Sequence, residues 1–269
     1  MIVEIFGPQG VGKTTFARAL AVELQNQHQD VGLVLSYRPA ERLPTNPGNH
    51  PTPAPTAAAA IRIARPAVEL LTMMLQPLTY RNDLHTTAKL LKALPPKKLL
   101  SSARLSQYIL RLSHSWHMAS RSNHVTLFDQ GFIQAVCSLV LSHPSAGEIL
   151  IAHALDVIPK PDILIQLGAP PDILAVRLHN RQRGLGLIER MLEVDPETSS
   201  EEHRIFEQLL GLLRKRGQTV TCIRSSDPHS LDEAAKTTAE QIKMVLRMPY
   251  VQKASTRWET LCGEDVPHA

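Results

Sequence analysis

A glycine-rich stretch near the start of the chain carries the residues best suited to bind phosphate. It runs from Gly7 to Thr15 with the sequence GPQGVGKTT, which fits the pattern G-x-x-x-x-G-K-[ST]. Glycines in such a loop let successive backbone N–H groups converge on a phosphate, and the partial positive charge of a helix N-terminus adds to the attraction. We therefore expect the polyphosphate of a nucleotide to bind here.

The side chains of this loop indicate which nucleotide chemistry to expect. Lys13 would reach the β- and γ-phosphates, and the hydroxyl group of Thr14 would coordinate Mg²⁺. ATP and Mg²⁺ are therefore the expected cofactors. The residues expected to bind the nucleotide are Gly7, Gln9, Gly10, Val11, Gly12, Lys13, Thr14, Thr15 and, from a later segment, Arg177.

Asp129 is the second candidate for chemistry, because it ends a short apolar run at residues 125–128. A carboxylate in that place can hold Mg²⁺, directly or through water, or accept a proton from an attacking hydroxyl group. The alternative is that Asp129 only caps the following helix. We favour the catalytic and metal-binding role, shared with Thr14, and expect Gln130 and Gln134 to contact an acceptor molecule.

Four arginines cluster later in the chain, at Arg177, Arg181, Arg183 and Arg190. Phosphoryl transfer needs positive charge close to the equatorial oxygens of the transferred group. Arg177 and Arg181 are four residues apart and so share one face of a helix. We expect Arg181 and Arg183 to be catalytic and residues 177–200 to form a lid; the alternative is an exposed basic helix end.

A parallel α/β sheet would bring these segments together. Short apolar runs predict strands at residues 2–6, 33–35, 125–129, 163–167 and 220–223, with helical segments between them. Strands that alternate with helices form a parallel sheet covered on both faces, with right-handed crossovers. Ligands of such sheets bind beyond the carboxyl ends of the strands. The glycine-rich loop, Asp129 and the arginine cluster are thus expected to border one crevice.

Residues 39–122 interrupt this alternation with a proline-rich loop and a basic helical insert. From residue 57 to residue 122, ten Lys and Arg residues against two acids give +8, whereas the whole chain carries +4. A basic insert beside a phosphate site favours an anionic second ligand. We expect this region to bind the acceptor, with Arg104 and Arg111 among the contacting residues; the alternative is a solvated basic surface.

The bulk composition is consistent with one packed domain over residues 1–269. The chain is 43% hydrophobic, and we find no run near the ~18 apolar residues of a membrane span. Neither a signal peptide nor a membrane partner is expected. Three scattered cysteines indicate reduced thiols and a cytoplasmic location. Residues 248–269 lack clear periodicity and are expected to form a peripheral tail.

On these motifs the sequence resembles the P-loop kinases of the nucleoside monophosphate kinase group, and within them the thymidylate kinases. The resemblance rests on the glycine-rich loop, the Arg38-Pro39 pair after the second strand, Asp129 and the arginines of residues 177–183. It implies a three-layer P-loop NTPase fold, with a five-stranded parallel sheet of order 2-3-1-4-5 and a helical insert. It also implies that Arg38 contacts an acceptor phosphate.

Two positions depart from the thymidylate kinases. Gln130 stands where those enzymes carry an arginine that grips the acceptor's phosphate, and Gln9 replaces an acid found in many of their P-loops. Both changes remove features that recognise a nucleotide acceptor. The acceptor is therefore left open between a nucleotide and another hydroxyl compound, such as a sugar or an antibiotic.

The sequence thus predicts an ATP- and Mg²⁺-dependent phosphotransferase. Its expected partners are a nucleoside triphosphate and a small, anionic acceptor, with a homodimer left open. The alternative is a nucleotide-dependent switch or ATPase that binds a partner through the basic insert. Nucleic-acid binding through the same insert is the least favoured hypothesis, because only 4% of the residues are aromatic and could stack on bases.

Overall fold

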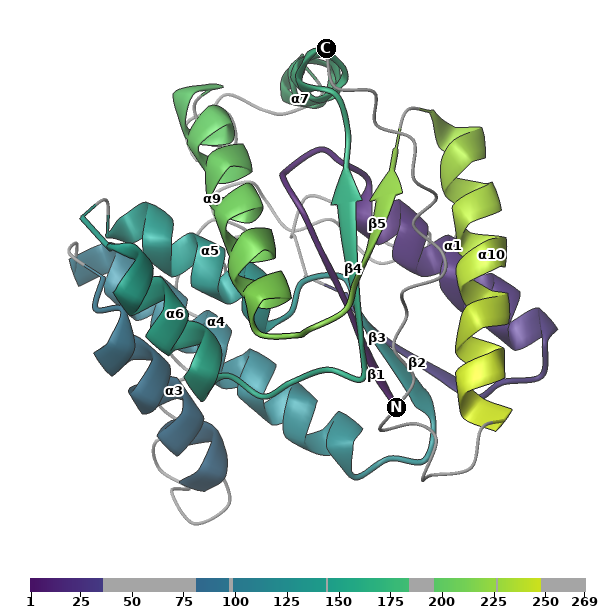
Figure 1. The fold of residues 1–269 in the computed structure, drawn as a ribbon, viewed down its shortest axis with the longest axis horizontal. Coiled ribbons are helices and arrows are strands. Elements are labelled where there is room, and N and C mark those ends of the chain that lie inside the picture. Colours follow the sequence, from purple (N-terminus) through teal and green to yellow (C-terminus); the bar gives the residue numbers. More distant parts are fainter. Residues whose placement is uncertain (36–80, 97–98, 144, 184–195, 226, 248–269) are drawn as a thin grey trace, which may run out of the picture.

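Five parallel strands form a sheet in the order β2-β3-β1-β4-β5 (Figure 1). The strands are β1 (Ile2–Phe6), β2 (Val31–Val34), β3 (Val125–Phe128), β4 (Ile163–Gly168) and β5 (Val220–Arg224). The order confirms the predicted P-loop NTPase fold, and each of the five strands overlaps a predicted apolar run, although β2 begins two residues before its run. β1 lies at the centre, because it pairs with β3 on one side and with β4 on the other.

This computed structural model describes residues 1–35, 81–96, 99–143, 145–183, 196–225 and 227–247. Several predicted features fall wholly or partly outside these ranges: Arg38, the proline-rich loop, residues 184–195 of the expected lid, and the tail from residue 248. They remain predictions.

Eight helices of the described chain connect and cover the strands. They are α1 (Lys13–Asn26), α3 (Arg81–Ala93), α4 (Leu99–Ser120), α5 (Phe132–Ser142), α6 (Glu148–Val157), α7 (Pro171–Arg183), α9 (Pro196–Lys215) and α10 (Pro228–Arg247). Three of them begin with proline. Proline suits the first helical position because it lacks an N–H, and an N–H at that position would have no partner within the helix. α9 begins at Pro196, so its first residues belong to the segment 177–200 that was expected to form the lid.

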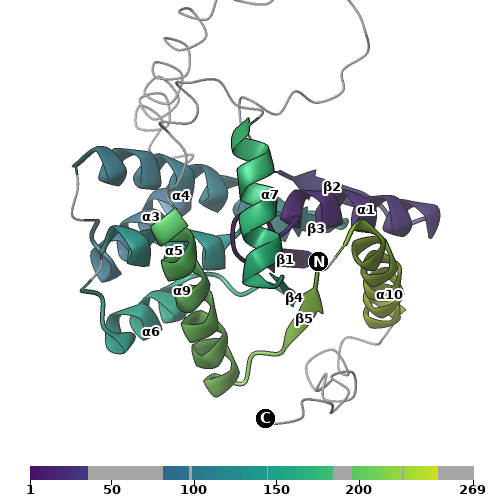
Figure 2. The same ribbon diagram turned by 90° about the horizontal axis from the view of Figure 1, so that it is seen from above.

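The helices form a layer on each face of the sheet, and α7 crosses above the ends of the strands (Figure 2). Successive side chains of a strand point to opposite faces. In β1, Val3 and Ile5 therefore pack with α1 and α10, whereas Ile2 and Phe6 face the layer that contains α4, α5 and α9. Glu4 shares the second face by the same alternation, and its side chain is fully buried.

The described part of the basic insert contributes to the main core. α4 buries Ile109, Leu112 and Trp116, and the Trp116 ring lies 5.0 Å from Phe128 and 5.2 Å from Phe132 between centroids. Aromatic contacts at such distances add to the stability gained by burial. The end of β3 and the start of α5 are thereby packed firmly against α4.

Candidate active site

The glycine-rich loop joins β1 to α1 and has the backbone conformation that its glycines allow. Gly7, Gly10 and Gly12 all have positive φ angles, of 147°, 78° and 101°. A Cβ atom on Gly7 would lie 2.2 Å from the carbonyl oxygen of Leu167, so any side chain there would collide with β4. The loop therefore follows a path that other residues would strain.

Lys13 lies inside this loop and is only 7% exposed. Its Nζ atom donates hydrogen bonds to the carbonyl oxygens of Gly7, at 2.6 Å, and Pro8, at 2.9 Å. A buried ammonium group needs such partners. The positive charge is thus held over the first turn of the loop, where the sequence predicts the phosphates to bind.

Thr14 and Asp129 lie next to each other at the start of α1 and the end of β3. The hydroxyl group of Thr14 donates to Oδ2 of Asp129 at 2.8 Å, and Asp129 is fully buried. These two oxygens fit Mg²⁺, which proteins bind through one or two carboxylates together with substrate phosphates and water. Both residues predicted to hold the metal are therefore close enough to share one ion.

The alternative role of Asp129 as a cap of α5 is taken by a different carboxylate. Oε1 of Glu4 accepts a hydrogen bond of 2.6 Å from the backbone N–H of Ile133, in the first turn of α5. Burial raises the pKa of Glu4 to about 8, although hydrogen bonds from Ile133 and Phe132 oppose that rise. A Cβ atom on Gly131 would lie 2.3 Å from Cδ of Glu4, so glycine is needed at this turn.

Arg177 reaches from α7 to the glycine-rich loop. One guanidinium nitrogen donates to the carbonyl oxygen of Val11 at 3.3 Å and to Oγ of Ser225 at 2.9 Å. Ser225 is fully buried, and its backbone N–H donates to the carbonyl oxygen of Gly168 at 2.7 Å. The ends of β4 and β5 thus meet the loop through Arg177.

The other predicted arginines lie at different positions around these strand ends. Arg181 and Arg183 belong to the last turn of α7, and their side chains are outside the described part of the structure. Arg104 and Arg111 are exposed on α4. They share a helix face with Tyr108, whose hydroxyl group donates to the carbonyl oxygen of Gly131 at 3.4 Å. That face of α4 therefore turns toward the β3–α5 junction.

The two predicted glutamines follow Asp129 at this junction. Gln130 is half-buried, whereas Gln134 is buried in α5 and donates through Nε2 to Oε1 of Glu202 at 3.2 Å. Glu202 also accepts a hydrogen bond from the backbone N–H of Gln9, through Oε2 at 3.1 Å. The structure thus joins Gln134 to the glycine-rich loop through a residue of α9.

Glu4 and Glu202 are the carboxylates that the sequence analysis missed. Glu4 left a signal, because it interrupts an otherwise apolar run assigned to a buried strand. Glu202 left none, because the pair Glu201-Glu202 in a polar segment is typical of a solvated helix surface. Its burial follows only from the packing of α9 against α5.

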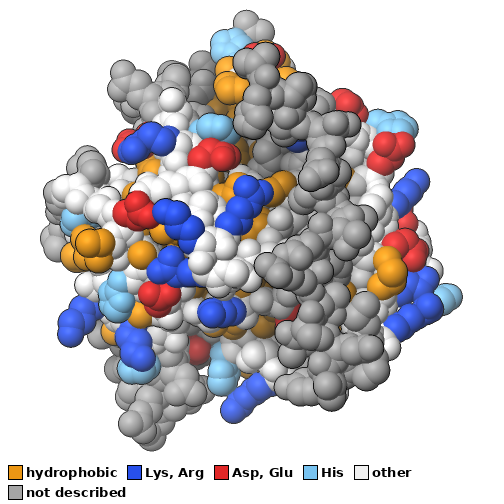
Figure 3. Space-filling model, in the orientation of Figure 1, with side chains coloured by type: hydrophobic (Ala, Val, Ile, Leu, Met, Phe, Trp, Pro, Cys, Tyr) orange, Lys and Arg blue, Asp and Glu red, His pale blue; other side chains and the backbone are white. Residues whose placement is uncertain are grey.

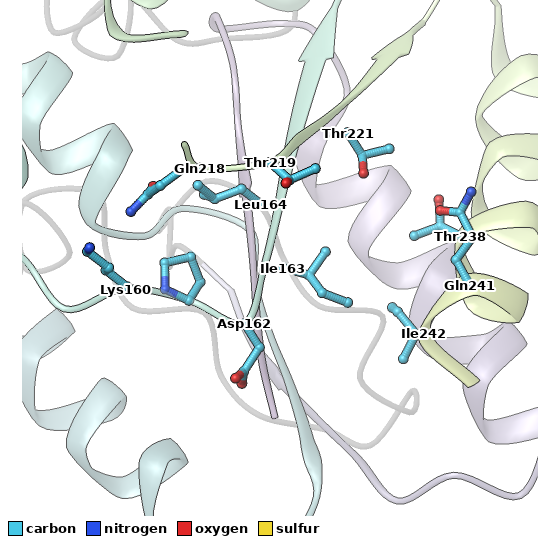
Figure 4. A pocket seen from close by; sticks show the side chains of 11 residues that line it. Lys160, Asp162, Ile163, Leu164, Gln218, Thr219, Thr221, Thr238, Gln241 and Ile242 are labelled. Carbon is cyan, nitrogen blue, oxygen red and sulfur yellow. The ribbon is translucent and has the colours of Figure 1, made fainter. Parts of the chain in front are cut away.

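A cavity of about 210 Å³ lies at the other end of the strands, among residues from the amino ends of β4 and β5 and from α10 (Figure 4). Lys160, Asp162, Thr221, Thr238 and Gln241 are among its lining residues. Parallel strands place their amino ends away from the ligand crevice. This cavity is therefore separate from the glycine-rich loop.

The surface in Figure 3 shows Lys and Arg side chains interspersed with acidic and apolar ones. No extended basic patch is visible among the coloured residues of this face. Within the described chain, no helix is both long enough and apolar enough to cross a membrane.

Comparison with known proteins returned a structural likeness. No protein-family model matches the sequence, and no curated protein matches it. Among solved structures, the chain is similar to a deoxyadenosine kinase from M. mycoides, described with the products dCMP and a flexible dCDP bound. The likeness covers 90% of this chain and 100% of that one, with 13% identity and a TM-score of 0.47. At that score it adds nothing to the sheet order and the loop, which define the fold by themselves.

Proposed function

We propose that this protein is an ATP- and Mg²⁺-dependent phosphotransferase that acts on a small-molecule acceptor. The observation that carries the proposal is the hydrogen bond of 2.8 Å between Asp129 and Thr14, which lies in the first turn of α1 directly after Gly12 and Lys13. This hydrogen bond joins a hydroxyl group next to Lys13 in the chain to a buried carboxylate, and both are oxygen ligands of the kind that Mg²⁺ prefers. Phosphoryl transfer depends mainly on such positioning and on electrostatic stabilisation.

Each residue has a defined role in this proposal. The loop N–H groups and Lys13 would bind the phosphates of ATP, and Thr14 and Asp129 would hold the Mg²⁺ that neutralises their charge. Asp129 holds the metal or accepts the proton of the attacking hydroxyl group. Arg177 holds the loop in place through Val11 and Ser225. Arg181 and Arg183, on a lid of residues 177–200, supply positive charge to the transferred group.

The acceptor is proposed to bind on the β3–α5 side, beside the insert of residues 39–122. Gln130, Gln134 and the α4 face with Arg104 and Arg111 border that side, and Arg38 is proposed to join them. Thymidylate is the first acceptor to test because of the resemblance to thymidylate kinases. The two glutamines at positions 9 and 130 extend the choice to nucleosides, sugars and other alcohols.

A screen of acceptors tests this proposal. Purified protein with Mg²⁺ and γ-labelled ATP is offered thymidylate, other nucleoside monophosphates, nucleosides, sugars and aminoglycosides. We expect label to appear on one of these classes, and to be lost when Lys13 is replaced by alanine. Hydrolysis of ATP that needs no acceptor, together with nucleotide-dependent capture of a partner protein, would instead favour the switch or ATPase hypothesis.

A further inference from the structure

Glu202 connects three segments that are far apart in the chain. It lies in α9 and is only 3% exposed. Oε2 accepts a hydrogen bond of 3.1 Å from the backbone N–H of Gln9 in the glycine-rich loop. Oε1 accepts one of 3.2 Å from the amide of Gln134 in α5. A single carboxylate thus bridges the proposed donor and acceptor sides of the site.

The bond to Gln9 completes the anchoring of the first half of the loop. The carbonyl oxygens of Gly7 and Pro8 already accept hydrogen bonds from Lys13. With the N–H of Gln9 engaged by Glu202, protein groups hold the loop from Gly7 to Gln9. The later N–H groups, toward the N-terminus of α1, are the ones suited to a phosphate.

The charge of Glu202 also affects the buried thiol of Cys137 in α5. Burial, and next the negative charge of Glu202, raise the pKa of the Cys137 thiol well above its usual range, whereas Lys13 lowers it. The carboxylate of Glu202 and the ammonium group of Lys13 therefore both influence one buried atom of α5. A buried carboxylate keeps its charge only if hydrogen bonds compensate for the lost water.

We propose that Glu202 is a positioning residue, which holds the first half of the glycine-rich loop and Gln134 in one arrangement. The inference rests on the proposed phosphotransferase function. Glu202 acts through Gln9 on the binding of ATP and through Gln134 on the acceptor side.

Four variants separate the hydrogen bonds of Glu202 from its charge. Glu202→Ala removes both hydrogen bonds. Glu202→Gln can retain both, because its amide oxygen accepts from Gln9 while the amide of Gln134 turns over to accept from the new N–H. Gln134→Glu sets two buried carboxylates against each other. The double variant E202Q/Q134E restores an amide–carboxylate pair with the charge moved to α5.

The readout is the Kd for Mg·ATP from isothermal titration calorimetry, which needs no acceptor. We expect the Kd to rise about tenfold in Glu202→Ala and in Gln134→Glu, but at most about threefold in Glu202→Gln and in the double variant. Glu201→Gln is the matched control, because Glu201 is the neighbouring residue and pairs only loosely with Arg204 at 3.8 Å. Its Kd should be unchanged.

Two results would overturn the positioning role. One is a Glu202→Ala protein that binds Mg·ATP as tightly as the wild type. The other is a double variant that binds Mg·ATP no better than Gln134→Glu alone. This second comparison tests the proposal even if the Glu202→Ala protein fails to fold. A wild-type protein that fails to bind Mg·ATP would instead contradict the proposed function itself.

Discussion

Thr14 at the start of α1 and Asp129 at the end of β3 meet across a hydrogen bond of 2.8 Å, although 115 residues separate them in the chain. The contact depends on the pairing of β1 with β3, which sets Glu4 opposite Phe128 and so brings the two strand ends together. In that position, Asp129 lies beside the loop that is expected to hold the phosphates of ATP.

The charge of Asp129 is expected to matter more than its hydrogen bond. In Asp129→Asn the amide oxygen can still accept from Thr14, so the fold should persist. The rate of phosphoryl transfer should nevertheless fall by about 10²-fold or more, because the metal and the attacking hydroxyl group lose a carboxylate. Initial rates at saturating Mg·ATP check this, with the exposed Asp232→Asn in α10 as control. An Asn variant with wild-type rates would exclude the role.

Lys13 is expected to be essential for transfer but not for folding. Lys13→Ala should reduce the transfer rate by about 10²- to 10⁴-fold, because a preorganised positive charge next to the phosphates is lost. The carbonyl oxygens of Gly7 and Pro8 lose their donor, which should cost about 1–2 kcal/mol of unfolding free energy. Transfer assays and urea denaturation measure the two effects. Arg18→Ala, at an exposed position of the same helix, should change neither.

Arg177 is expected to act through the loop that it holds. Arg177→Met would leave the carbonyl oxygen of Val11 and the hydroxyl group of Ser225 without this donor. We expect the Kd for Mg·ATP to rise about tenfold, since a charge-assisted pair of hydrogen bonds no longer fixes the loop. Calorimetric titration measures it. If Arg177→Met bound Mg·ATP normally, Arg177 would have no part in the nucleotide site.

Glu4 is expected to make stability depend on pH. Burial raises its pKa from 4.5 to about 8, so the folded protein keeps a proton that the unfolded chain has lost. The contribution of Glu4 to stability is therefore greatest below pH 4.5 and declines toward pH 8, by at most about 1.4 kcal/mol per pH unit. Urea denaturation across that window should show a flatter pH dependence for Glu4→Gln. An equal slope in both proteins would refute the assignment.

Gly131 is expected to tolerate no side chain because of Glu4. In Gly131→Ala the new Cβ atom would lie 2.3 Å from Cδ of Glu4, and neither group can move far in a packed core. We expect a loss of about 1–3 kcal/mol in unfolding free energy. Gly147→Ala is the matched control, since Gly147 also precedes a helix but has no atom within 4 Å of its Cβ position. Equal stability of the two variants would contradict the expected clash.

Much of the scaffold could be predicted from local sequence. The apolar runs predicted all five strands, and helices connect them as expected. Local prediction succeeds there because hydrophobic periodicity within a segment determines which face it buries. It did not predict the start of α9, because residues 196–200 were assigned only to the expected lid. A proline can open a helix, but nothing in those residues shows the core that the helix packs on.

The sequence by itself determined the glycine-rich loop, the order of strands and helices, the strand end that carries Asp129 and the helix that carries Arg177. These features depend on residues close together in the chain, where spacing alone specifies the conformation. Only the tertiary structure decided which side chains meet. It joined Thr14 to Asp129, buried Glu4 against Gly131, and placed Glu202 between the loop and α5. Such contacts form across long stretches of chain, and their distances are set by how helices pack on the sheet.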